Sequence, residues 1–254
     1  MIDRLKKLLE KRGHYFFKPS RMNGSPEFEI DGLSYGVNIP QANFSPWRND
    51  EDFTKIYAAA SKNTLVDMYR CYELWQLVNE ALKKSSELNV IEIGVWRGGT
   101  ASLISKRMQM SNQKGTLYLA DTFAGVVKIG EKDSYYVGGE HNDTSKEIVE
   151  NFLRSLALNN FEILQGTFPD ETADLIPGNI QFGLVHIDVD VYLSAKDCLD
   201  WVWDKLIVGG IVVFDDYGFH TCDGVTRLVE EQRQYNDRIV IHNLNGHGLL
   251  IKTS

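Results

Sequence analysis

Two acidic clusters, each directly after an apolar run, set the strongest constraint on how this chain can fold. They are HIDVD at residues 186–190 and FDD at residues 214–216. The preceding apolar runs are typical of buried strands, and carboxylates gathered at two strand ends repel one another unless a cation lies among them. The pattern therefore predicts a divalent metal site. Hard oxygen ligands without a cysteine pair favour Mg²⁺, with Mn²⁺ or Ca²⁺ as alternatives, over structural zinc.

Helix capping is the alternative explanation for Asp215 and Asp216, because aspartate is a good N-cap residue at a strand-to-helix turn. One aspartate would be enough for that role. Two adjacent aspartates, matched by Asp188 and Asp190 at the end of a different strand, favour the metal hypothesis.

Composition limits the class of protein. The 254 residues, 43% hydrophobic and 24% charged, suffice for one sizeable α/β domain with an appendage. A formal net charge of -8 disfavours a nucleic-acid partner, which would need an excess of Lys and Arg. Residues 1–20 mix charges with apolar residues, and no run has the length of a membrane span. We expect a cytoplasmic protein without a membrane partner and with reduced cysteines.

The chain is expected to divide into an N-terminal appendage, residues 1–60, and a main domain, residues 61–254. The appendage would hold an amphipathic helix at residues 2–12, followed by irregular chain up to about residue 50. Apolar residues at helical spacing over 52–84 predict two helices that lead into the main domain.

Strand and helix signals alternate in the main domain. Strands are expected at residues 89–93, 116–120, 161–164, 182–187 and 211–214, with helices near 99–108, 145–157 and 193–206. This alternation predicts a mostly parallel sheet with helices on both faces. Two further strands, on either side of Asn245-Gly246, predict a C-terminal antiparallel hairpin.

A glycine-rich turn, EIGVWRGGT at residues 92–100, joins the first of these strands to a helix. Glycine permits close backbone approach to a ligand, and a helix N-terminus favours an anionic group. The spacing does not match the dinucleotide motif GxGxxG, and a P-loop lysine is absent. We therefore expect a different nucleotide-like cofactor. Asp121, at the end of the next strand, could accept both hydroxyls of a ribose, with helix capping as the alternative.

Four motifs in this order, EIGVWRGGT, LADTF, LVHIDVDVY and GGIVVFDDYG, resemble the macrocin O-methyltransferase family over residues 64–229. The family, which includes the novobiocin-pathway sugar methyltransferase, consists of class I S-adenosylmethionine-dependent enzymes that methylate sugar hydroxyls. The resemblance implies a Rossmann-like α/β fold with a mostly parallel seven-stranded sheet and a C-terminal antiparallel hairpin. It also implies metal-dependent methyl transfer to a hydroxyl of a sugar on a glycosylated natural product, nucleotide sugar or surface glycan.

The resemblance further implies which residues form the site. The cofactor residues are Glu92, Gly94 and Thr100 on the methionine side, Asp121 at the ribose, and Gly166, Thr167 and Phe168 near the adenine. The metal ligands fall on Asp188, Asp215 and Asp216, with Asp188 also catalytic and Asp190 as the general base.

Asp190 lies two residues after Asp188, so both side chains would share one side if the strand continued, with Asp190 nearer the acceptor. His186 is a second candidate base, although a buried structural histidine is the commoner outcome. His141 and His220 lie on predicted loops and could touch substrate. Cys222, close to an acidic cluster, is a further candidate, but functional thiols are scarce.

The segment 126–144 is long for a connection, which fits either a lid or a contact with a partner subunit. We expect a sugar-containing small-molecule acceptor and a homo-oligomer. Trp96, Trp201 and Trp203 are expected in the core.

Two alternative functions remain: a catechol-type phenolic O-methyltransferase, and a non-catalytic protein of the same fold that binds a glycan or a partner. The clustered aspartates disfavour the non-catalytic alternative, because an idle site has no use for buried charge.

Overall fold

The computed structural model describes residues 27–36, 42–83, 87, 89–111 and 114–254. The helix expected at residues 2–12 lies outside these ranges. The chain forms two compact units, Met1–Gln41 and Ala42–Ser254. In the first unit, β1 (Glu27–Ile30) and β2 (Leu33–Gly36) pair antiparallel where irregular chain was expected. Asp31 and Gly32 both have positive φ in the turn between them, and Asp-Gly favours this hairpin geometry.

Two helices open the second unit, as the apolar spacing predicted. They are α2 (Glu51–Ala60) and α3 (Met68–Leu82), preceded by a short 3-10 helix at Pro46–Arg48. An aspartate caps each helix: the Asp50 carboxylate accepts the Phe53 N–H at 2.9 Å, and the Asp67 carboxylate accepts the Tyr69 N–H at 2.8 Å.

The rest of the chain alternates strands and helices, as predicted. The elements are β3 (Asn89–Ile93), α4 (Gly99–Met110), β4 (Leu117–Asp121), α5 (Lys146–Ser155), β5 (Phe161–Gln165), β6 (Phe182–Ile187), α6 (Tyr192–Trp203), β7 (Leu206–Phe214), α7 (Asp223–Glu231), β8 (Arg238–His242) and β9 (Gly248–Lys252). The helix α7 was not expected, and β7 begins at Leu206 instead of residue 211.

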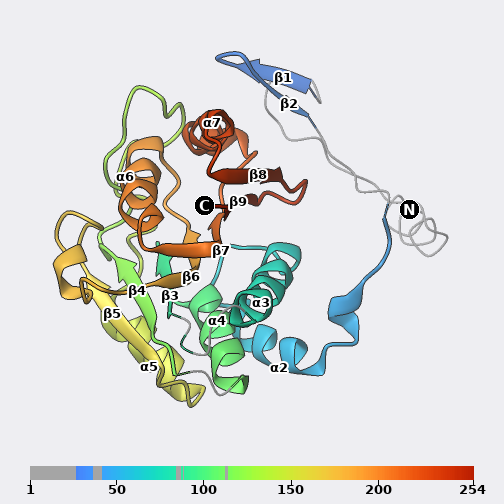
Figure 1. Ribbon diagram of the computed structural model, residues 1–254, viewed down its shortest axis with the longest axis vertical. Helices are drawn as coiled ribbons and strands as arrows, with labels where there is room; N and C mark the ends of the chain where they lie inside the picture. Colours follow the sequence, from blue (N-terminus) through green and yellow to red (C-terminus); the bar gives the residue numbers. More distant parts are fainter. Residues whose placement is uncertain (1–26, 37–41, 84–86, 88, 112–113) are drawn as a thin grey trace, which may run out of the picture. The chain divides into compact units, whose positions relative to one another are not determined.

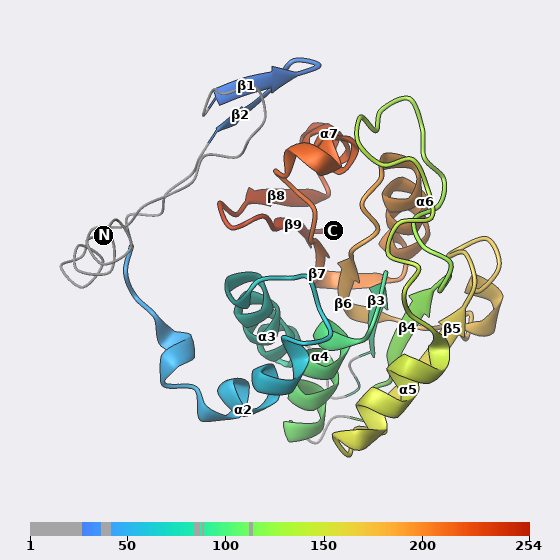
Figure 2. The same ribbon diagram turned by 180° about the vertical axis from the view of Figure 1, so that it is seen from behind.

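The strands form one seven-stranded sheet in the order β5-β4-β3-β6-β7-β9-β8. Pairing is parallel from β5 to β7 and antiparallel in the final hairpin, which confirms the predicted Rossmann-like architecture. Helices cover both faces of the sheet (Figure 1 and Figure 2). Ile91 and Val185 point into the core shared with α6 and α7, whereas Val90 and Leu184 point into the core shared with α3, α4 and α5.

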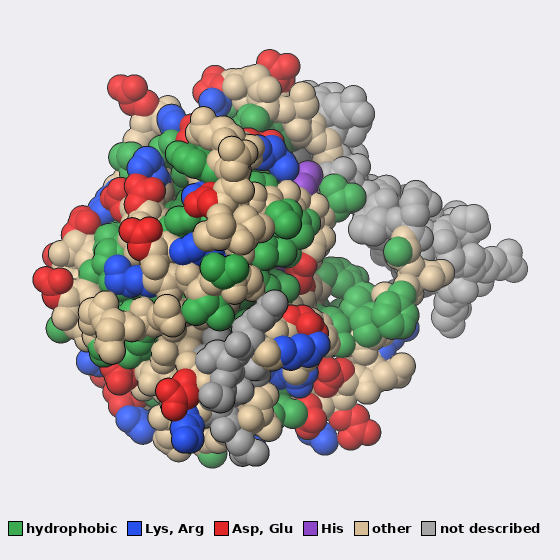
Figure 3. Space-filling view, viewed as in Figure 1, with side chains coloured by type: hydrophobic (Ala, Val, Ile, Leu, Met, Phe, Trp, Pro, Cys, Tyr) green, Lys and Arg blue, Asp and Glu red, His purple; other side chains and the backbone are tan. Residues whose placement is uncertain are grey.

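Basic and acidic side chains are interspersed over the face drawn in Figure 3. Several large apolar side chains are exposed, among them Phe44 at 81% and Leu65 at 65%. Within the described part of the chain, no helix combines the length and apolar character that a membrane crossing requires.

The helix α2 belongs to the second unit because it shares a small aromatic core with α3. Phe53 is 1% exposed, and its ring centroid lies 4.8 Å from that of Tyr72 and 6.0 Å from that of Trp75. Leu103 of α4 completes this cluster. The compact body therefore begins at Ala42, nearer the N-terminus than the boundary expected after residue 60.

We predict that Phe53→Ala lowers the free energy of unfolding by about 3–5 kcal/mol, because it opens a cavity between α2 and α3. Phe44→Ala is the matched control; its ring is 81% exposed, so the change should stay within about 0.5 kcal/mol. Chemical denaturation of the full chain measures both. Equal, small effects would mean that α2 does not contribute to the core.

Candidate active site

A cavity of about 270 Å³ lies at the carboxyl ends of the parallel strands. The chain leaves β3 and β6, which are neighbours, toward opposite edges of the sheet, and such a switch point is where α/β sheets bind ligands. The predicted residues that line this cavity are Gly94, Thr100, Asp121, Gly166, Thr167, Phe168, Asp188, Asp190, Asp215 and Asp216. These residues, which come from positions 94 to 216 of the sequence, thus share one space because parallel strands end at the same edge.

Glu92 differs from this expectation, because it is fully buried and is not among the residues that line the cavity. It pairs with His186 across the β3–β6 register, and its carboxylate lies 2.9 Å from His186 Nδ1. The Glu92 carboxylate therefore contacts the buried His186 ring and not the cavity. Of the three residues implied on the methionine side, Gly94 and Thr100 line the cavity, and their contact with a cofactor stays a prediction.

The glycine-rich turn is held against β6 and β4. A side chain at Gly94 would place its Cβ 1.7 Å from the Asp188 carbonyl oxygen, and φ is +87°, so only glycine fits. The Asp121 carboxylate accepts the backbone N–H groups of Val95 and Trp96 at 2.7 and 2.8 Å. Asp121 therefore shapes the turn instead of capping a helix, and its binding of a ribose stays a prediction.

Asp188, Asp215 and Asp216 offer carboxylate oxygens that all lie within 4.8 Å of one another. Burial, together with the neighbouring charges of Asp215 and Asp216, raises the pKa of Asp188 well above its usual range. Burial and the charges of Asp190 and Asp215 raise the pKa of Asp216 in the same way. Three hard oxygen donors that repel one another in a buried site suit a divalent cation such as Mg²⁺. Capping does not explain them, since α7 begins at Asp223 after Cys222.

The backbone turn after β6 sets the orientation of the Asp190 side chain. The strand ends at Ile187 and Asp190 has φ of +66°, so the expectation of continued strand alternation was wrong. Its N–H donates to the Asp216 carboxylate at 2.9 Å, and its own carboxylate accepts the Tyr136 hydroxyl. Burial raises the pKa of Asp190, although the Tyr136 hydrogen bond opposes this. A carboxylate with a raised pKa that faces the cavity suits a general base.

Three basic side chains surround Asp215. The Arg70 guanidinium donates to its carboxylate, His247 Nε2 lies 2.8 Å from Oδ1, and His186 Nε2 lies 3.5 Å from the same oxygen. Burial alone would raise the pKa of Asp215, but the two histidines and Arg70 hold it well below its usual range. Asp215 is therefore the member of the acidic group that ionises most readily.

His186 is fully buried and does not line the cavity, so the structure favours a structural histidine over a second base. Burial would lower the pKa of His186, but the carboxylates of Asp215 and Glu92 outweigh it and raise the pKa to about 10. His141 lines the cavity, whereas His220 does not.

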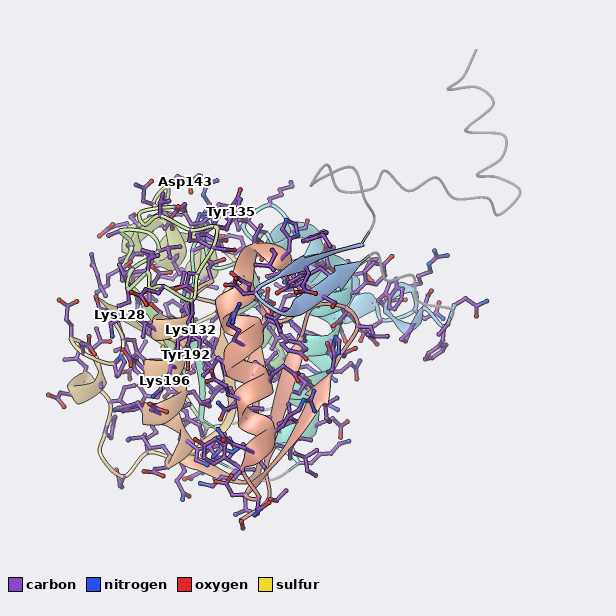
Figure 4. All side chains as sticks on the ribbon, turned by 90° about the horizontal axis from the view of Figure 1, so that it is seen from above. Lys128, Lys132, Tyr135, Asp143, Tyr192 and Lys196 are labelled. Atoms are coloured by element: carbon purple, nitrogen blue, oxygen red, sulfur yellow. The ribbon has the colours of Figure 1, made fainter. Side chains whose placement is uncertain are left out.

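The loop between β4 and α5 borders the cavity and contributes Tyr136 and His141 to its wall. It is tied to the helices on one face: the Asp133 carboxylate accepts the Tyr192 N–H at 2.8 Å, and Lys132 Nζ lies 3.6 Å from the centre of the Tyr192 ring (Figure 4). At its other end, Asp143 accepts the Trp96 indole N–H at 2.8 Å. Trp96 lines the cavity, so its expected place in the core was wrong.

Sequence reasoning missed Arg70, Glu73 and His247. Arg70 and Glu73 lie within the apolar pattern of α3, and His247 follows a turn-forming Asn-Gly, so no local motif distinguishes them. An arginine in the first turn of a largely apolar helix was the one available signal. Cys222, in contrast, was flagged: it is buried, with Sγ 3.6 Å from the Asp216 carboxylate.

Comparison with known proteins agrees with this geometry. The structure is similar to that of the O-methyltransferase NovP, with a TM-score of 0.65 and 23% identity over 76% of this chain and 83% of that one. It is also similar to the O-methyltransferase TomG from Streptomyces achromogenes in complex with SAM, with a TM-score of 0.54 and 16% identity over 81% and 91% of the two chains. The fold is therefore that of the Rossmann-like methyltransferases.

The family follows from the sequence. Residues 49–245 match the model of the Macrocin-O-methyltransferase (TylF) family, and the chain belongs to that family. A relative is the 8-demethyl-8-(2,3-dimethoxy-alpha-L-rhamnosyl)-tetracenomycin-C 4'-O-methyltransferase of Streptomyces olivaceus, 28% identical over 171 residues. The match covers 63% of this chain and 64% of that relative.

We predict that His186 stays protonated at pH 8, because its pKa of about 10 lies well above the ordinary value of 6.5. Nitrogen-15 NMR should then detect a proton on both ring nitrogens. Glu92→Gln should lower this pKa, since it removes the negative charge 2.9 Å from Nδ1. Titration of His186 near pH 6.5 in the unsubstituted protein would contradict the assignment.

Proposed function

We propose that this protein transfers a methyl group from S-adenosylmethionine to a sugar hydroxyl of a glycosylated small molecule, with the help of a divalent cation. One observation carries the proposal: the glycine-rich turn and four carboxylates from two strand ends face the same cavity. Family membership and the rhamnosyl-bearing substrate in the relative's name support a sugar acceptor. The SAM bound to the similar fold of TomG supports the methyl donor.

Each part of the cavity would have its own task. The turn at Gly94 and Asp121 would hold the donor, with Gly166, Thr167 and Phe168 along its adenine side. Asp188, Asp215 and Asp216 would hold the cation, which when bound lowers the pKa of a coordinated hydroxyl.

Asp190 would take the proton in the chemical step. The acceptor oxygen attacks the methyl carbon, the carbon–sulfur bond breaks, and the hydroxyl proton passes to the Asp190 carboxylate. The products are a methyl ether and S-adenosylhomocysteine. Because the Asp190 carboxylate accepts the Tyr136 hydroxyl in this structure, the acceptor hydroxyl would share or replace that hydrogen bond. Much of the acceleration would come from holding the two substrates in line.

Purified protein and labelled S-adenosylmethionine test this function directly. We expect methyl transfer to rhamnosylated or other glycosylated aglycones, no turnover in excess chelator, and recovery with added Mg²⁺. Transfer to catechols without transfer to sugars would favour the phenolic alternative. Donor binding without transfer to any acceptor would favour the non-catalytic alternative, and full turnover in chelator would exclude the cation.

A second prediction separates the base from the cation ligands. Asp190→Asn should keep Mn²⁺ and S-adenosylhomocysteine affinity while lowering kcat on the order of a hundredfold or more, as expected for a lost general base. Asp188→Asn should weaken Mn²⁺ binding as well, because it removes a charged oxygen ligand. Calorimetry and initial rates measure the two effects.

Asp200→Asn is the matched control for both variants, since this carboxylate is exposed on α6 and pairs with Lys196 away from the cavity. It should change neither measurement. Wild-type turnover by Asp190→Asn would remove Asp190 from the base role. Intact Mn²⁺ binding by Asp188→Asn, with loss in Asp190→Asn, would exchange the two roles.

A further inference from the structure

Glu73 joins the C-terminal hairpin to α3. Its carboxylate accepts the side-chain amides of Asn243 and Asn245, and Oε2 lies 2.8 Å from His247 Nδ1. These partners lie 170 or more positions away in sequence, at the turn between β8 and β9. One partly buried carboxylate thus contacts both the turn and the ring that follows it.

His247 bridges two carboxylates. It is 0% exposed, and its ring has Glu73 at 2.8 Å from Nδ1 and Asp215 at 2.8 Å from Nε2. Ionised carboxylates only accept hydrogen bonds, so both ring nitrogens must donate and the ring has a fixed orientation. The preceding residue, Gly246, packs closely against Phe219, because a Cβ at Gly246 would lie 2.5 Å from the Phe219 ring, which itself lines the cavity.

The bridge ends on one of the proposed cation ligands. Asp215 has two carboxylate oxygens: His247 occupies one side of Oδ1, and Arg70 donates to Oδ2 and to the Asp215 carbonyl oxygen at 3.0 Å. These contacts restrict rotation of the carboxylate about its side-chain torsions. Asp215 offers a carboxylate oxygen within 4.8 Å of those of Asp188 and Asp216, with which it forms the acidic group.

We propose that Glu73 and His247 are positioning residues that orient Asp215 for the cation, so that the C-terminal hairpin is part of the cation site. This inference rests on the proposed function, because it requires that the three aspartates bind a divalent cation. The carboxylate–histidine pair behind a ligand is a general means of raising metal affinity, and its loss commonly weakens binding on the order of 10–100-fold.

The test is calorimetric titration of the full chain with Mn²⁺. We expect Glu73→Gln and His247→Gln each to weaken Mn²⁺ binding at least about tenfold, while S-adenosylhomocysteine affinity stays within about twofold. Because Glu73 acts through His247, the two losses should not add. The double variant, Glu73→Gln with His247→Gln, should bind Mn²⁺ about as tightly as the single variant with the lower Mn²⁺ affinity. A purely structural role would instead lower S-adenosylhomocysteine affinity and thermal stability together with Mn²⁺ affinity.

Glu80→Gln is the matched control, since Glu80 lies on the same helix, is exposed and pairs with Lys83. It should leave Mn²⁺ affinity unchanged. If Glu73→Gln does not fold, Glu73→Asp keeps the charge but shortens the reach to His247, and it should also weaken Mn²⁺ binding.

Three results would overturn the inference. Mn²⁺ affinity within twofold of the unsubstituted protein in both single variants would show that Asp215 needs no such support. Equal losses of Mn²⁺ affinity, S-adenosylhomocysteine affinity and thermal stability would show general unfolding instead of positioning. No Mn²⁺ binding by the unsubstituted protein would remove the cation from the proposed function, and the positioning role with it.

Discussion

Repulsion among carboxylates at the carboxyl edge of the sheet is the interaction on which the site depends. Two like charges about 4 Å apart repel by about 4 kcal/mol at an effective dielectric constant near 20, so several cannot all stay ionised together. The protein meets this in two ways. Arg70, His186 and His247 surround Asp215 and keep it charged, whereas the pKa values of Asp188 and Asp216 are raised. Asp188 and Asp216 lack such basic partners among the described residues, and a bound cation would stabilise their ionised forms. The three aspartates are therefore a candidate metal site.

The sheet order explains why these groups meet at all. Parallel strands β3, β6 and β7 are adjacent, so the residues that follow them collect at one edge although they are far apart in the chain. The register then sets finer contacts: Glu92 lies opposite His186, and both are buried. Two of the three compensating basic groups come from outside this parallel part of the sheet, since Arg70 lies on α3 and His247 precedes β9, whereas His186 lies on β6 itself.

Much of this architecture could be predicted from sequence, because strand and helix periods and strand-end residues are local signals. The seven-stranded sheet, the terminal hairpin and the cavity positions of Asp121 and the four aspartates all follow from such signals. Contacts that depend on the direction of a side chain were harder to predict from the sequence. Glu92 precedes a glycine turn, yet it points to its partner on β6. Asp190 leaves the strand through a positive φ, which the two-residue spacing did not indicate. Arg70 and His247 depend on packing between distant elements.

The buried charge network is costly for stability. A buried ion pair seldom stabilises a fold more than apolar residues of similar size would, because desolvation offsets the attraction. Here, however, apolar replacements for Arg70, Glu73 and His247 would leave Asp215 in a buried site with His186 as its one remaining partner among those described above. They would also free its carboxylate to turn away from Asp188 and Asp216. The network is best understood as fixing the direction of one carboxylate, and through Glu73 it makes that direction depend on the hairpin turn at the far end of the sequence.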